Sequence, residues 1–77
     1  MKPGESGVYS PVAGSLWKLN VSEPGRRVRA GEILAVLESM KTEIPVAAES
    51  DCEIVRIFCA AGNEVKSGQC LFAVKTN

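Results

Sequence analysis

The sequence predicts an all-β domain, built either as two thin sheets packed face to face or as a flattened barrel. Short runs of β-branched and aliphatic residues recur at close spacing, and Gly, Pro, Ser or Asn interrupts them. No stretch repeats its apolar residues with the helical period of about 3.6 residues. The two halves of the chain also resemble each other. These observations together favour many short strands, which must pair in two layers to bury their apolar faces.

The apolar runs define the expected strands and the expected core. The strands are expected at residues 7–10, 15–21, 27–28, 33–39, 42–47, 53–59, 64–65 and 70–75. The core is expected to contain Val12, Leu16, Leu19, Val21, Val28, Leu34, Val36, Val46, Ile54, Ile57, Val65, Leu71 and Ala73. Residues 1–6 are expected to form a flexible lead-in and residues 7–77 the domain itself. A chain of 77 residues has room for one core only.

An internal repeat supports this fold class. Residues 8–21 align with residues 46–59 at an offset of 38. After one extra residue in the first half the offset becomes 37, and both halves contain the pattern G-x-x-V-x-x-G-x-x-L, from Gly25 to Leu34 and from Gly62 to Leu71. Glycines at such places serve tight turns, where φ is positive or two backbones approach closely. The repeat therefore predicts two superimposable halves related by a pseudo-twofold axis.

The stretch that joins the two halves is Glu38-Ser39-Met40-Lys41-Thr42-Glu43. Apolar runs flank it on both sides, as expected for a β-hairpin. A two-residue turn would consist of Met40 and Lys41, although such turns require positive φ, which residues other than glycine adopt reluctantly. A Met-Lys turn without a conformational reason suggests that Lys41 has a chemical use. In the pseudo-twofold arrangement this hairpin lies at one end of the domain and both termini lie at the other.

Composition excludes several classes of function. Nine basic and nine acidic residues give a net charge of zero, which disfavours nucleic acid as a partner. No apolar run is long enough to span a membrane, and the first residues do not form a signal peptide. The absence of histidine excludes Ser/His and Cys/His nucleophile systems and removes the usual general base. We therefore expect a non-catalytic carrier, binding or structural domain.

The three cysteines, Cys52, Cys59 and Cys70, indicate the redox state of the compartment in which the protein is expected to reside. A structural zinc site normally needs four Cys or His ligands, and only three are present. No two cysteines form a CxxC pair. We interpret them as small apolar residues in a reducing compartment, which is expected to be the cytoplasm, with the mitochondrial matrix or another reducing organelle as alternatives.

The central stretch resembles the E-A-M-K-M-E signature of biotinyl domains, the biotin carboxyl carrier modules of biotin-dependent carboxylases. Ser10-Pro11-Val12-Ala13-Gly14 is similar to the opening motif of that family, and the paired glycine turns are similar to its repeated turns, so the resemblance covers nearly the whole chain. Thr42 stands where the family has a second methionine, and Ala48-Glu49-Ser50-Asp51-Cys52 lacks the Pro and Gly of the second opening motif. Within the family, the sequence looks most like the carrier domains of urea carboxylase and urea amidolyase.

The resemblance implies a flattened barrel of two four-stranded antiparallel sheets. It also implies that a biotin protein ligase attaches biotin to Lys41 through an amide bond, with Met40 contributing to recognition by the ligase and with Glu38, Ser39, Thr42 and Glu43 flanking the site. The biotin would then shuttle carboxyl groups between biotin carboxylase and carboxyltransferase sites. The domain itself would be a monomeric, non-catalytic part of an ATP-dependent ligase complex.

Two alternatives share the same fold. A lipoyl-type carrier domain also presents a lysine at a hairpin, but its turn typically reads D-K-A. The methionine before Lys41 therefore favours biotin. The second alternative is an adaptor of this fold that binds other proteins and leaves Lys41 unmodified.

Overall fold

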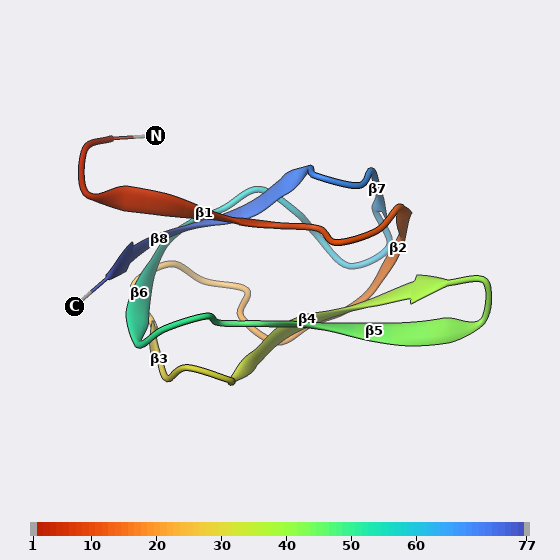
Figure 1. Cartoon of the computed structure of the whole chain (residues 1–77), viewed down its shortest axis with the longest axis horizontal. Helices are drawn as coiled ribbons and strands as arrows, with labels where there is room; N and C mark the ends of the chain where they lie inside the picture. The colour runs from red at the N-terminus through yellow and green to blue at the C-terminus, as the bar shows by residue number, and fades with distance from the viewer. Residues whose placement is uncertain (1, 77) are drawn as a thin grey trace.

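The computed structural model describes residues 2–76 and confirms an all-β fold of two four-stranded sheets (Figure 1). One sheet has the strand order β1-β8-β6-β3 and the other the order β5-β4-β2-β7, with antiparallel pairing throughout. The strands are β1 (Glu5–Tyr9), β2 (Gly14–Leu19), β3 (Arg27–Val28), β4 (Ile33–Ser39), β5 (Thr42–Ala47), β6 (Cys52–Ile57), β7 (Glu64–Val65) and β8 (Cys70–Thr76). No helix that could cross a membrane occurs among these described residues.

The observed strands agree with the expected ones except at some ends. Strands β3, β4, β5 and β7 have the expected bounds. The main difference lies at the start of the chain, because β1 begins at Glu5. Glu5 and Ser6, which fall within the expected flexible lead-in of residues 1–6, pair with Lys75 and Val74 of β8. Both residues are polar, so the apolar pattern did not mark them as part of a strand. Residues 1 and 77 lie outside the described residues.

Hydrogen bonds at the turns confirm the pseudo-twofold relation. The Gly25 N–H donates to the Ile54 carbonyl at 2.7 Å, and the Gly62 N–H donates to the Leu16 carbonyl at 2.8 Å. These two bonds are equivalent, because Gly62 repeats Gly25 and Ile54 repeats Leu16. The two glycines have φ values of 96° and 92°, as their place in the repeat predicted. Each sheet combines strands from both halves, so neither half can form its sheet alone.

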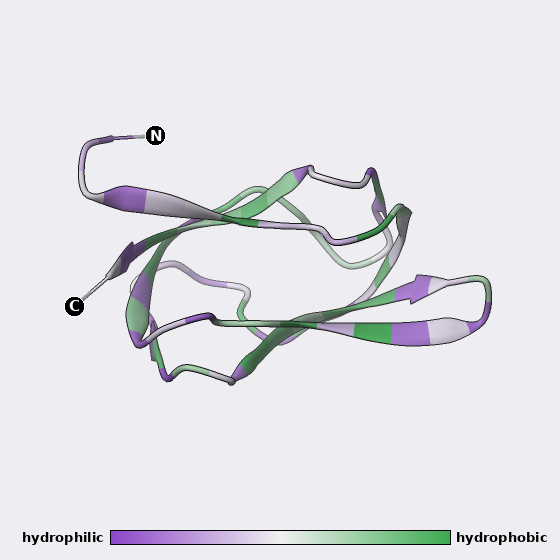
Figure 2. Cartoon of the chain, in the orientation of Figure 1, coloured by the Kyte–Doolittle hydropathy of each residue, from purple (hydrophilic) through white to green (hydrophobic). Residues whose placement is uncertain are grey.

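The core lies between the two sheets and contains most of the expected residues. Of these, Leu16, Val21, Val28, Leu34, Val46, Ile54, Val65, Leu71 and Ala73 are buried. Val12, Leu19 and Ile57 are partly buried against the core, while Val36 is partly buried outside it. Six further buried hydrophobic residues were not expected: Ala35, Leu37, Ala48, Cys52, Phe72 and Val74. Figure 2 shows hydrophobic residues along the middle of β4 and β8, whereas the end of the β4–β5 hairpin carries hydrophilic and hydrophobic residues in turn.

Irregular pairing explains two of these missed core residues. The register shifts between Ile33 and Ala35 on β4, and β1 skips one residue of β8 between Phe72 and Cys70. Such bulges break the strict alternation of side chains between the two faces of a strand. As a result, Leu34 and Ala35 are both fully buried, as are Leu71 and Phe72. Alternation alone assigns only one residue of each pair to the core.

Candidate functional site

The hairpin of β4 and β5 ends in the two-residue turn that the sequence predicted. Ser39 and Thr42 form the last cross-strand pair, and Met40 and Lys41 connect them with φ values of 50° and 66°. Two positive φ values in succession are typical of type I′ turns, whose twist matches that of the strands. The left-handed conformation costs an L-residue about 1–2 kcal/mol. Burial does not offset this cost at Met40, because the side chain is 96% exposed.

The hairpin projects from the barrel because β2, the strand on the other side of β4 from β5, begins below the turn. Strand β2 pairs with β4 as far as Ser15 opposite Glu38 and begins at Gly14. Beyond Glu38, β5 is the only described strand that pairs with β4. Figure 1 shows the turn at one end of the long axis, with the start of β1 and the end of β8 near the other end. A partner can therefore reach Lys41 without touching the segments next to the chain termini.

Two carboxylates face each other just below the turn. Glu38 and Glu43 are directly opposite on β4 and β5, and both are exposed. Like charges at opposite positions of a sheet destabilise it. Within residues 2–76, neither carboxylate makes an ion pair, and the Lys41 amine makes none either. The lysine therefore lies free in solvent beside an acidic pair, where a binding partner can contact all three groups.

The structure brings together all six residues singled out in the sequence. Met40 and Lys41 form the turn, Ser39 and Thr42 form the pair below it, and Glu38 and Glu43 form the next pair. Sequence reasoning missed Gly14, which lies against the backbone of Glu38 at the base of the projecting hairpin. The glycine ends the opening motif Ser10-Pro11-Val12-Ala13-Gly14, but only the register of β2 with β4 shows what it touches.

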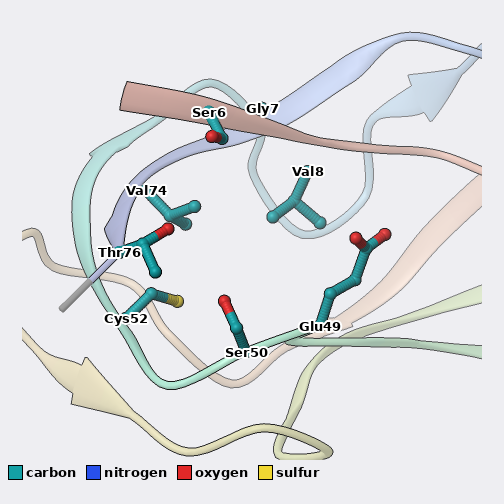
Figure 3. A pocket seen from close by; sticks show the side chains of 8 residues that line it. All are labelled: Ser6, Gly7, Val8, Glu49, Ser50, Cys52, Val74 and Thr76. Atoms are coloured by element: carbon teal, nitrogen blue, oxygen red, sulfur yellow. The ribbon is translucent and has the colours of Figure 1, made fainter. Parts of the chain in front are cut away.

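A pocket of about 240 Å³ lies elsewhere in the molecule, between β1, β8 and the segment that links β5 to β6 (Figure 3). Its apolar wall includes Val8 and Val74, and the hydroxyl groups of Ser6, Ser50 and Thr76 lie around it. None of residues 38–43 lines it. The exposed lysine and this pocket are therefore separate features.

The cysteines lie apart from the hairpin and form no disulfide. Cys52 belongs to the core, and Cys59 is partly buried against it. Burial raises the pKa of both thiols, and the negative charges of Asp51 and Glu32 raise that of Cys52 further. A raised pKa keeps a thiol protonated and unreactive. No group of three metal-ligating side chains was found within residues 2–76.

Comparison with known proteins agrees with this geometry. A family model described as "Biotin-requiring enzyme" matches residues 6–74. The chain is 37% identical over 68 residues to the biotin-dependent acyl-coenzyme A carboxylase alpha3 subunit of Mycobacterium leprae. The aligned segment covers 88% of this chain and 11% of that protein. It is 32% identical over 69 residues to the urea amidolyase of Saccharomyces cerevisiae, covering 90% of this chain and 4% of that protein.

A shorter relative and a solved structure extend the comparison. The biotin/lipoyl attachment protein of Bacillus subtilis is 33% identical over 66 residues, covering 86% of this chain and 89% of that protein. The structure of a single-chain, multi-domain long-chain acyl-CoA carboxylase superposes with a TM-score of 0.92 at 30% identity, covering 100% of this chain and 8% of that one. The chain thus spans only a small part of the carboxylases and most of the attachment protein.

Proposed function

The chain belongs to the biotin/lipoyl family of biotin-requiring enzymes, as a carrier domain of the biotin-dependent carboxylase type, and we propose that Lys41 is the residue to which biotin is attached. One observation carries the proposal. Lys41 lies in the turn of a projecting hairpin, in a positive-φ conformation, with its amine free in solvent. Lysine can form an amide through its amine, whereas arginine cannot replace it in this role.

The surroundings of Lys41 fit a covalently attached group. The turn has no third strand beside it, so an acyl chain on Nζ would displace no described side chain. In the proposed reaction, a biotin protein ligase supplies biotin as its acyl adenylate. The Lys41 nitrogen attacks the acyl carbon, an amide bond forms, AMP leaves, and the amine loses a proton. Bound biotin would supply a ureido nitrogen that holds a carboxyl group.

The chain's own residues would present the amine and provide contacts for the ligase. The left-handed turn keeps Met40 and Lys41 outside the barrel. Met40 offers an exposed, adaptable apolar side chain beside the reacting amine. The acidic pair of Glu38 and Glu43 would be relieved of its mutual repulsion by a basic partner surface. A fixed starting point for the biotin arm also raises the local concentration of biotin near a tethered active site.

The partners in carboxyl transfer would be a biotin carboxylase and a carboxyltransferase, and this chain would serve them without catalysing a step itself. The names of the relatives support two kinds of parent enzyme, an acyl-coenzyme A carboxylase and a urea carboxylase or amidolyase. Both would use the carrier in the same way, so the role of Lys41 depends on neither. We also place the protein in a reducing compartment such as the cytoplasm, which the three free thiols support.

The experiment that tests the proposal compares two modifying enzymes. Purified protein is incubated with biotin protein ligase, ATP and biotin, or with lipoate protein ligase, ATP and lipoate, and the intact mass is measured. We expect one biotinyl group, no lipoyl group, and neither group on the Lys41→Arg variant, which keeps the charge. Addition of lipoate alone would establish a lipoyl carrier. A protein modified in neither reaction would be an unmodified adaptor, and biotin on Lys41→Arg would move the site elsewhere.

A further inference from the structure

We infer that Gly14 is a positioning residue that sets the direction in which the β4–β5 hairpin presents Lys41. The inference rests on the proposed function of Lys41. A Cβ atom built on Gly14 would lie 2.6 Å from the carbonyl oxygen of Glu38, 3.3 Å from its carbonyl carbon and 3.4 Å from the Cβ of Ser39. Ordinary contact begins near 3.4 Å, so the shortest approach is about 0.8 Å too close for any side chain. All three atoms belong to the base of the hairpin.

Gly14 is needed for space and not for backbone conformation. The glycines of the repeated turns have positive φ values, whereas Gly14 does not. It is a strand residue of β2 and pairs with Val65 of β7. A glycine inside a strand often marks a place where another backbone approaches closely. Here the approaching backbone is that of Glu38, three residues before Lys41.

The obstacle is a main-chain carbonyl, which cannot turn aside as a side chain can. A larger residue at position 14 must therefore displace either β2 or the base of the hairpin. The neighbouring part of β2 is held firmly, because Leu16 is fully buried and its N–H donates to the Asn63 carbonyl at 2.8 Å. Glu38 pairs with both Ser15 of β2 and Glu43 of β5, but among the described strands only β5 pairs with the hairpin beyond it. We therefore expect the hairpin, which has fewer pairing partners, to be the part that moves.

Such a movement affects an enzyme that contacts the barrel and the hairpin together. If the ligase binds the barrel of the variant as it binds the wild type, the displaced Lys41 amine is not aligned with the acyl carbon of the biotinyl adenylate. A misplacement of about 1 Å at a reacting atom can cost on the order of 100-fold in rate. For Gly14→Ala, we expect the biotinylation kcat to fall by at least about 10-fold. Partial unfolding would instead raise the apparent KM and leave kcat unchanged, since saturating protein still fills the ligase with folded molecules.

Two control variants test whether the kcat of Gly14→Ala falls because Lys41 is misplaced. One control reproduces only the steric crowding, and the other reproduces only the loss of stability. Gly7 and Tyr9 both belong to β1, in the sheet that does not contain Gly14. In Gly7→Ala, the new Cβ would lie 2.5 Å from the ring of Tyr9, but that ring is half exposed and can turn away. In Val28→Ala, a buried side chain of the same sheet as Gly7 is shortened, which lowers stability away from the hairpin. Both controls are expected to keep the wild-type kcat.

The direct measurement is the orientation of the hairpin in solution. Residual dipolar couplings of the amides of residues 39–42 are compared with those of the barrel amides, in wild type and in Gly14→Ala. We expect the barrel couplings to stay the same, the hairpin couplings to change, and kcat to fall. Unchanged hairpin couplings in Gly14→Ala would overturn the inference, and so would an unchanged kcat. A Gly14→Ala chain that does not fold would also overturn it, because Gly14 would then be needed for the fold of the barrel. A wild-type protein that accepts no biotin would refute the proposed function instead, while the couplings would still test the geometry.

Discussion

Replacing Met40 by glycine should stabilise the fold while weakening recognition of the site. Met40 has a φ of 50°, and its side chain is 96% exposed. Removing that side chain therefore loses almost no burial, and the backbone dominates the result. Relief of the left-handed conformation gains about 1–2 kcal/mol, and the greater freedom of glycine in the unfolded chain removes about 0.4–1 kcal/mol of this gain. The difference spans about 0–1.6 kcal/mol, with a central gain of roughly 0.8 kcal/mol.

Urea and thermal unfolding measure this gain. For a domain of this size, about 1 kcal/mol corresponds to 4–8 °C in Tm, so Met40→Gly should raise Tm by roughly 2–8 °C. Ser39→Gly is the matched control. Ser39 is a strand residue without positive φ, and its replacement should lower stability by about 0.5–1 kcal/mol. Biotinylation of Met40→Gly should be slower, because the apolar contact is lost. If Met40→Gly destabilised the protein as Ser39→Gly does, the account of the turn would be wrong.

The remaining predictions concern the core and pH. Phe72 is fully buried, so Phe72→Ala should cost about 3–5 kcal/mol, a large part of the stability of a small domain, and the urea midpoint should fall accordingly. Burial raises the pKa of the Cys52 thiol in the folded protein above its ordinary value of 9.0. The protonated thiol therefore contributes its full stability below pH 9.0, and this contribution is lost as the pH rises through the higher pKa of the folded state. The free energy of unfolding should therefore decline at alkaline pH, and less steeply in Cys52→Ala; equal slopes would contradict this reasoning.

The repeat made much of the fold predictable from the sequence. Gly25 and Gly62 marked equivalent turns, and the apolar runs gave β4 and β5 their observed bounds. The failures arose where a residue's environment depends on its neighbours across the sheet. Phe72 was missed because a bulge buries it beside Leu71, and local alternation contains no sign of a bulge. Glu5 was missed because its place in β1 depends on pairing with β8.

The candidate site was predictable for a different reason. Its six residues are consecutive in the chain, so one hairpin is enough to bring them together, and no long-range contact had to be known. Gly14 lies outside this stretch and meets Glu38 only through the register of β2 with β4. Short-range chemistry was therefore readable from the sequence, whereas the contact that sets the direction of the hairpin was not.

The most direct test of the central claim is the chemical state of Lys41 in the organism that makes the protein. The protein is isolated from its host, digested, and the peptide that contains residues 38–43 is analysed by tandem mass spectrometry. We expect a biotinyl group in amide linkage on Lys41, and no biotinyl group on Lys18 or Lys66 in the other peptides of the digest. A lipoyl group on Lys41, or an unmodified Lys41 in biotin-replete cells, would contradict the claim that this hairpin carries biotin.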